Sequence, residues 1–166
     1  MREAAAAIEA TATVAVAPEE VFDFLSDLAN HWLLVDRYVE VISLAGSPGR
    51  APDSGLVRLR GPLGVRRTVR TRVTETRSPG LIVGTAELGA RTRARVSWTL
   101  EGRPGETRVR LAAEVEDASQ LDRVLLALGG RFWLRRRFAS GLERLGERFA
   151  EAPAADGVAR SASVGG

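Results

Sequence analysis

Three polar side chains that could do chemistry lie on one face of a predicted strand. Residues 65–77 alternate, so that Arg67, Thr71 and Glu75 share a face with three valines. On an inward face, an Arg beside a carboxylate could orient a carbonyl or a phenolate, and Glu75 could accept a proton. The simpler interpretation, which we favour, is that these side chains reach water at the strand ends or pair with each other.

His31 is the third candidate for catalysis, beside Arg67 and Glu75. It is the only histidine, and histidine has the only side chain whose unperturbed pKa lies near neutral pH. It could therefore transfer a proton, although we favour a histidine at the surface or at a mouth with a structural hydrogen bond. The next residue, Trp32, could cover an opening or pack in the core, and the sequence leaves both interpretations open.

The composition excludes several classes of site. The 166 residues contain no Cys, which rules out thiol nucleophiles, iron–sulfur clusters and cysteine-ligated zinc, and a single His rules out a multi-histidine metal site. No phosphate loop, dinucleotide fingerprint or nucleophile elbow is present. We therefore expect neither a metal nor a cofactor. The longest apolar stretches are too short to span a bilayer, and the N-terminus does not resemble a secretory signal, so we expect a cytoplasmic protein.

The charge is unevenly distributed. All 24 basic residues are Arg, and residues 58–110 hold thirteen Arg against four acids, a net charge of +9. If the strand alternation holds, ten arginines lie on the outward face: Arg58, Arg60, Arg66, Arg70, Arg72, Arg91, Arg93, Arg95, Arg108 and Arg110. This face could bind an acidic partner, but we favour a solvated face. We expect no nucleic acid, because the outward positions carry no aromatic residues for base stacking.

A second basic stretch lies in residues 131–138, which hold four arginines together with aromatic and aliphatic residues. It could contact an anionic membrane peripherally. We favour packing of its Phe and Leu side chains inward, with the Arg stems covering apolar surface.

Hydrophobic periodicity predicts the elements that must position these residues. Period-two patterns predict strands at 8–16, 55–61, 65–77, 90–101 and 106–116; 38–46 is apolar and β-rich with an ambiguous facing, and a further strand is expected at 81–88. Helical spacing predicts helices at 18–25, where Pro18 suits the first position, and at 119–149, and Ser26-Asp27 can cap a short helix at 28–33. Gly129 and Gly130 interrupt the last helix. Short turns between successive strands predict an antiparallel meander. We expect one domain over residues 1–150 and a disordered tail over 151–166.

This order of elements gives an α+β fold with a helix-grip architecture. A sheet of seven strands has one apolar face, and one long amphipathic C-terminal helix is available to cover it. We expect a curved antiparallel sheet wrapped around that helix, with two short helices after the first strand.

The segment from Val14 to Asp27 resembles the opening of proteins of the SRPBCC superfamily, also called START-like, helix-grip or polyketide cyclase/dehydrase-like, and the pair His31-Trp32 resembles the region that follows. The resemblance implies an apolar cavity between the sheet and the long helix. The superfamily includes lipid- and steroid-transfer domains, coenzyme Q-binding proteins and aromatase/cyclases.

We therefore expect binding of a small hydrophobic ligand, such as a lipid, a quinone or a polyketide-like molecule. The alternative is a polyketide cyclase or dehydratase, a lyase-type enzyme without a metal, and the second alternative is the acidic partner of the Arg-rich face. The side chains expected to line the cavity are Trp32, Val57, Leu59, Val69, Thr71, Val73, Thr92, Val96, Trp98, Leu125, Leu128 and Phe132.

Overall fold

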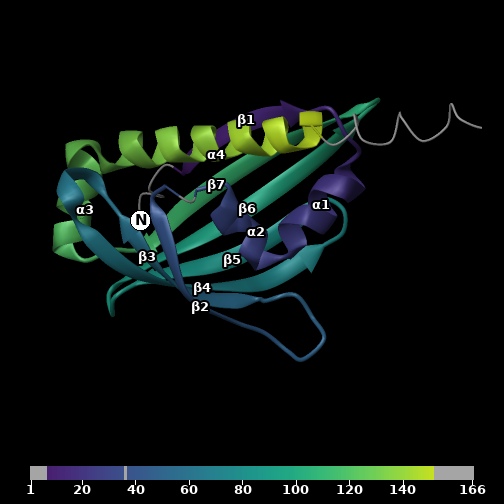
Figure 1. The fold of residues 1–166 in the computed structure, drawn as a ribbon. Helices are drawn as coiled ribbons and strands as arrows, with labels where there is room; N and C mark the ends of the chain where they lie inside the picture. Colours follow the sequence, from purple (N-terminus) through teal and green to yellow (C-terminus); the bar gives the residue numbers. More distant parts are fainter. Residues whose placement is uncertain (1–6, 36, 152–166) are drawn as a thin grey trace, which may run out of the picture.

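The computed structural model describes residues 7–35 and 37–151 as a curved antiparallel sheet with helices along its inner face (Figure 1). The last helix ends at Glu151, and the rest of the predicted disordered tail lies outside the described residues.

Seven strands form one sheet in the order β1-β7-β6-β5-β4-β3-β2, and every neighbouring pair is antiparallel. This confirms the predicted meander, which the first strand extends by pairing with the last. The strands are β1 (Ile8–Val14), β2 (Val39–Ala45), β3 (Ser54–Arg60), β4 (Arg66–Arg77), β5 (Leu81–Leu88), β6 (Thr92–Arg103) and β7 (Glu106–Asp117).

The helices follow the predicted order. They are α1 (Pro18–Ser26), α2 (Leu28–Leu33), α3 (Gln120–Leu125) and α4 (Arg131–Glu151), with a 3-10 turn η1 (Pro62–Gly64) and a π-helical segment η2 (Leu126–Gly130). The helix-grip prediction is confirmed, because the long helix α4 packs on the sheet along β1 and reaches β7 (Figure 1).

Local sequence explains where the two short helices begin. Pro18 occupies the first turn of α1, where its missing N–H is not needed, and two glutamates follow it near the positive end of the helix dipole. The carboxylate of Asp27 caps α2 by accepting a hydrogen bond from the backbone N–H of Ala29 at 2.9 Å.

The predicted interruption of the C-terminal helix is a full break. Leu128 leaves the helical conformation, and Gly129 has a φ angle of 117°, a region that favours glycine. The chain therefore changes direction between α3 and α4. The shorter segment, α3 with η2, lies at one end of the sheet, beyond the part that α4 covers (Figure 1).

The hydrophobic core occupies the end of the sheet that faces α1 and the C-terminal half of α4. Its buried residues are Val14, Val21, Phe22, Leu25, Leu34, Ile82, Trp98, Leu100, Val109, Leu111, Leu142 and Leu145. Toward the α3 end, the inner face continues as a cross-strand row of partners from β4 to β7, and these side chains are half-buried and outside this core: Thr71, Ala86, Ala94 and Val115. The core cluster thus covers one end of the inner face, and the row beside it is only half-buried.

A β-bulge in β4 overturns one expectation. The register shifts between Val73 and Glu75, so that Glu75 lies opposite Val83, a residue of the outward set. One extra residue in a strand moves every later side chain to the other face. The expectation that Glu75 shares the inner face with Arg67 and Thr71 is therefore wrong; its carboxylate pairs with the guanidinium of Arg77 at 2.7 Å.

The outer face carries nine of the ten arginines predicted there, whereas Arg91 lies in the turn before β6. Nine of the ten expected arginines are exposed, and Arg58 is half-buried. Acids offset part of this charge through the ion pairs Arg58–Glu40, Arg93–Glu87 and Arg110–Glu9. Exposed ion pairs contribute little stability, so these contacts add little to the free energy of folding.

The one-sided core predicts unequal costs for two leucine substitutions. Leu145 in α4 is 0% exposed, whereas Leu128 in η2 is 80% exposed. We expect Leu145→Ala to lower the free energy of unfolding by about 2–5 kcal/mol, because it leaves a cavity in packed surroundings. Leu128→Ala should change it by less than about 0.5 kcal/mol. Urea unfolding followed by circular dichroism measures both values, and equal losses would contradict the described core.

Candidate functional site

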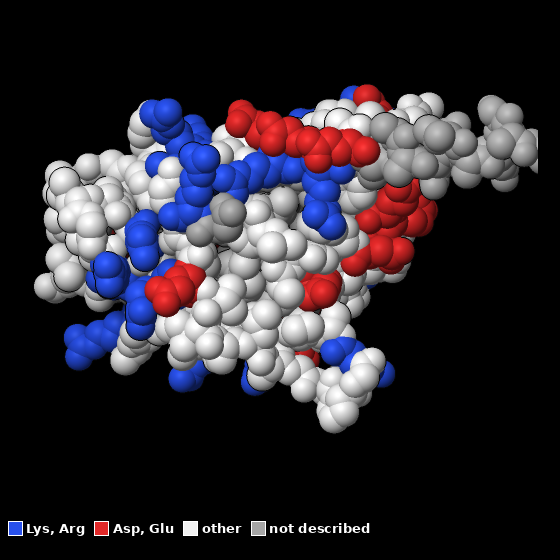
Figure 2. Space-filling view, viewed as in Figure 1, with Lys and Arg blue, Asp and Glu red and all other residues white. Residues whose placement is uncertain are grey.

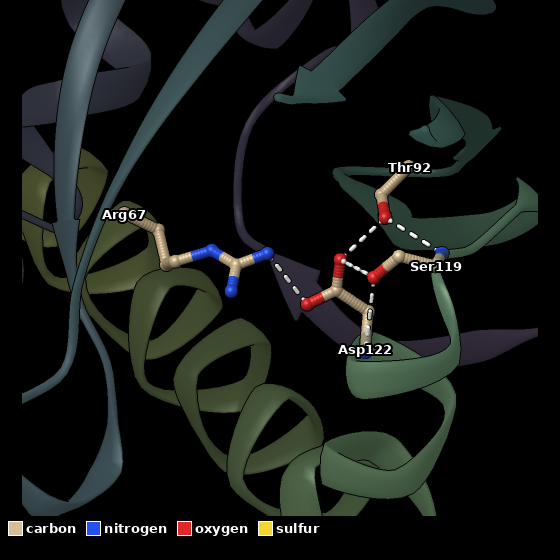
Figure 3. A network of polar contacts seen from close by, with 4 residues as sticks. All are labelled: Arg67, Thr92, Ser119 and Asp122. Atoms are coloured by element: carbon tan, nitrogen blue, oxygen red, sulfur yellow. Dashed lines mark hydrogen bonds and ion pairs between the residues drawn. The ribbon is translucent and has the colours of Figure 1, made fainter. Parts of the chain in front are cut away.

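A polar network ties α3 to the sheet at the loosely packed end (Figure 3). The guanidinium of Arg67, at the start of β4, donates a hydrogen bond to the carboxylate of Asp122 at 2.6 Å. Thr92, at the start of β6, donates its hydroxyl to the same carboxylate, and Ser119 does so at 2.9 Å. Ser119 also caps α3, accepting from the backbone N–H of Asp122 at 3.2 Å.

Asp122 is the buried centre of this network, with 7% of its surface exposed. Burial by itself opposes ionisation, but the hydrogen bonds from Thr92 and Ser119 and the charge of Arg67 outweigh it and lower the pKa of Asp122 below its ordinary value. The carboxylate is thus ionised at neutral pH, and it holds α3 against two strands.

A pocket of about 290 Å³ opens beside the network. It is lined by Arg67, Leu88, Gly89, Ala90, Arg91, Thr92, Ser119 and Asp122. Its wall therefore combines two guanidinium groups with the apolar end of β5. Of the twelve residues expected to line the cavity, Thr92 is the only one that lines this pocket, which lies at the mouth of the inner face rather than deep within it.

Arg67 is the residue of this pocket best suited to bind a polar group of a ligand, because its guanidinium has several N–H donors. A guanidinium carries five N–H donors in a planar fork that matches carboxylate and phosphate oxygens. Asp122 is the only acceptor that Arg67 contacts within the described part of the chain. The remaining donors can bind an oxygen of a molecule in the pocket, and the exposed Arg91 adds a second positive charge.

His31 lies elsewhere, in the packed half of the inner face. Its Nε2 is 2.6 Å from the backbone carbonyl of Leu25, and because a carbonyl only accepts, Nε2 must carry the proton. The ring packs edge-on against Trp98, with centroids 5.4 Å apart. Burial lowers the pKa of His31 and outweighs the opposing effects of the Leu25 hydrogen bond and of Asp27. His31 is thus a neutral, structurally bonded histidine.

The structure does not bring the three catalytic candidates together. Arg67 bonds into the network beside Thr92, whereas His31 lies against Trp98, six residues further along β6. Six residues of a strand span roughly 20 Å. Glu75 lies on the opposite face of the sheet. Of the three, Arg67 alone lines the mouth pocket.

The other expected cavity residues divide by their place on the inner face. Trp98 belongs to the core, and Val73 and Val96 pack against it. Nearer the mouth, Val57 and Val69 are buried, and Leu59 and Thr71 are half-buried.

The helical candidates are placed differently. Leu125, Leu128 and Phe132 are exposed on the outside of the α3 end, with Phe132 66% exposed. Trp32 is half-buried, and its indole N–H is buried without an acceptor among the described residues.

A second pocket, also of about 290 Å³, lies on the outer face of β1, β6 and β7. Its lining is charged and polar: Glu9, Thr11, Thr99, Glu101, Arg108 and Arg110. An apolar ligand has nothing to contact there. Within residues 7–35 and 37–151, no three Asp, Glu or His side chains gather closely enough to hold a metal ion, and no helix is long and apolar enough to cross a membrane.

Sequence reasoning missed the central residue of the site. The sequence offers Asp117 or Ser119 as the cap of this helix, with Asp122 three residues after Ser119, and the structure shows that Ser119 is the cap of α3. What this capping pattern does not reveal is that the Asp122 carboxylate also pairs with Arg67, a residue 55 positions earlier in the chain. No local signal in the sequence indicates that pairing.

A family model described as polyketide cyclase / dehydrase and lipid transport matches residues 5–150. The chain belongs to this family. The match spans the sheet, both short helices and nearly all of α4, so it covers every element that forms the mouth pocket. The predicted SRPBCC/START-like membership is confirmed. No curated protein matches the chain in sequence.

Solved structures share the fold of this chain at low sequence identity. A START superfamily protein from Mycobacterium smegmatis matches with a TM-score of 0.65 and 16% identity, over 86% of this chain and 97% of its own. TTHA0849 from Thermus thermophilus matches with a TM-score of 0.63 and 18% identity, over 89% of this chain and 99% of its own. Zhui aromatase/cyclase from Streptomyces sp. R1128 matches with a TM-score of 0.59 and 19% identity, over 89% of this chain and 96% of its own. At these identities the likeness concerns the fold alone.

The network predicts an acid-sensitive contribution to stability. Because the folded-state pKa of Asp122 lies below its ordinary value, its ionised form stabilises the folded state at neutral pH. That stabilisation is lost as the pH falls from the ordinary carboxyl pKa through the lowered value. We expect Asp122→Asn to cost about 1–3 kcal/mol at neutral pH and to lose less further stability on acidification than the unmodified protein.

Urea unfolding at a series of pH values measures this difference. Asp117→Asn is the matched control, because Asp117 is an exposed carboxylate five residues earlier. The control should follow the pH profile of the unmodified protein. If Asp122→Asn also follows that profile, the network does not stabilise the fold in the way described.

Proposed function

We propose that the protein binds a small molecule with an apolar body and an oxygen-bearing polar end, and that the body lies on the loosely packed half of the inner sheet face. One observation carries this proposal. The inward row Thr71, Ala86, Ala94 and Val115 is half-buried and outside the core cluster, so small side chains line the region between the core and the mouth. We propose that this binding takes place in the cytoplasm.

The polar residues of the mouth support a ligand with one charged or carbonyl end. Small-molecule sites are mostly apolar and hold a few convergent polar groups that fix orientation. The mouth pocket has such groups in Arg67 and Arg91, and its volume lies near the lower end for small-molecule sites. A fatty acid, a quinone or a polyketide-like molecule meets this requirement.

Binding is favoured over the cyclase or dehydratase alternative. A general base must lie within hydrogen-bond reach of the proton that it removes. Glu75 is on the outer face, and the Nε2 of His31 is engaged by Leu25. Among the mouth residues, Asp122 is a carboxylate already bonded to three side chains. Arg67 can orient an oxygen atom, which is a binding role.

A large side chain placed on the inner face should weaken the binding of an apolar fluorescent probe. Anilinonaphthalene sulfonate combines apolar rings with an anionic group, and its fluorescence rises in apolar surroundings. We expect Ala94→Trp to weaken its binding by at least about tenfold, since the new side chain takes the place of the rings. Arg95→Trp, one position along and on the outer face, should change it by less than about twofold. Fluorescence titration gives both constants.

Two controls keep this test interpretable. Near-ultraviolet circular dichroism must show intact packing in each variant, and Ala94→Leu is the smaller substitution if Ala94→Trp fails to fold. The double variant Leu128→Ser/Phe132→Ser removes exposed apolar side chains at the α3 end and should leave probe binding unchanged. Equal binding by the two Trp variants, or loss of binding in the Leu128/Phe132 variant alone, would remove the proposal.

A further inference from the structure

Helix α3 buries its acidic residue and exposes its apolar side chains, the opposite of what is usual for a helix at the surface of a protein. Such helices normally turn their apolar residues to the core and their charges to water. In α3 the one buried residue is Asp122. Leu126, Trp133 and Leu134 are half-buried, but five neighbouring apolar side chains of α3, η2 and the first turn of α4 are exposed: Leu121, Val124, Leu125, Leu128 and Phe132. We call these five residues the apolar patch.

The apolar patch is not an incidental scatter. It holds five of the ten large exposed hydrophobic residues among the described part of the chain, within twelve consecutive positions. Contiguous exposed apolar surface usually marks a site of interaction. The Asp122 network fixes the orientation, because it holds the polar side of α3 on the sheet and leaves the leucines outside.

Arginines surround the apolar patch. From residue 118 to 142 the only acid is the buried Asp122, whereas this range holds five arginines. Three of them are exposed: Arg123 in α3, and Arg135 and Arg136 in α4. The guanidinium of Arg136 lies 5.8 Å from the centre of the Phe132 ring, so charge and apolar surface are in direct contact.

The opposite end of the molecule is acidic. The exposed residues Glu19, Glu20 and Asp23 lie on α1, and the C-terminal half of α4 adds exposed glutamates. Figure 2 shows basic side chains gathered mainly toward the α3 end and acidic ones toward α1. In the field of a negatively charged surface, this distribution turns the α3 end toward that surface and the α1 end away from it.

We infer that the apolar patch and its arginines dock the protein on an anionic membrane surface. Leucine and phenylalanine side chains enter the boundary between headgroups and acyl chains, and the arginines contact lipid phosphates and carboxylates. A second copy of the chain fits less well, because a two-fold contact through this patch would gather the exposed arginines of both copies in one interface, and the only acid in residues 118–142 is the buried Asp122. Docking here also brings the mouth pocket, which α3 flanks, close to the lipid.

This inference differs from the expectation for residues 131–138. We expected the Phe side chains of that stretch to pack inward, and Phe138 does pack against the core. Phe132 does not, because the chain breaks at Gly129 and starts α4 with this residue facing solvent. The inferred docking surface therefore joins the exposed side chains of α3 and η2 to Phe132, Arg135 and Arg136 of the basic stretch.

The test is sedimentation of the full chain with vesicles. Vesicles of phosphatidylcholine with phosphatidylserine are compared with vesicles of phosphatidylcholine alone, at low and at high salt. We expect binding to the anionic vesicles that weakens with salt. Leu128→Ser/Phe132→Ser and, separately, Arg135→Gln/Arg136→Gln should each reduce it by at least about tenfold.

Matched controls use exposed residues outside the apolar patch. Val41→Ser/Ile42→Ser changes exposed apolar residues of β2, and Arg70→Gln/Arg72→Gln removes two arginines of the outer sheet face. Both should bind as the unmodified protein does. The inference is overturned if no vesicles bind, if neutral vesicles bind equally, or if the Arg70/Arg72 variant alone loses binding. Probe titration of the inner face is a separate readout, so failure here leaves the ligand proposal untouched.

Discussion

A single helix is too narrow to cover a sheet of seven strands, and most features of this protein follow from that mismatch. Seven neighbouring strands span about 30 Å, whereas a helix with its side chains is about 10 Å across. Curvature reduces the difference without removing it. Helix α4 lies along β1, and α1 packs near the middle of the sheet, so together they complete a core at one end. At the other end the inner face keeps small, half-buried side chains.

The chain closes that second end with polar contacts rather than with packing. Asp122 is bonded to Arg67, Thr92 and Ser119, which join two strands and the start of α3. A buried carboxylate with several hydrogen bonds is costly to move, since each lost partner leaves an unpaired group in poorly hydrated surroundings. The same contacts require α3 to turn its leucines outward. The mouth pocket and the apolar patch are therefore two consequences of one arrangement.

Much of the fold could be predicted from the sequence because local patterns determine it. Alternation located five of the strands, Pro18 and Asp27 marked the short helices, and the Gly129-Gly130 pair marked the break before α4. The limits were equally physical. A bulge at residues 73–75 has no distinctive residue type, so strict alternation placed Glu75 on the wrong face. The pairing of Arg67 with Asp122 depends on strand order and curvature, which no local pattern contains. Helical spacing predicted Leu125, Leu128 and Phe132 inside, whereas the break and the network put them outside.

The most direct test of this account is the mapping of methyl resonances by NMR while a long-chain fatty acid is added to the full chain. The account predicts shifts at Val69, Ala86, Ala94 and Val115 on the inner face near the mouth. The methyls of Val83 and Ala112 on the outer face, and of Leu142 and Leu145 in the core, should stay unchanged. Shifts confined to the outer face or to the exposed leucines of α3, or an inner face that shows none, would contradict the claim that this half of the sheet receives a ligand.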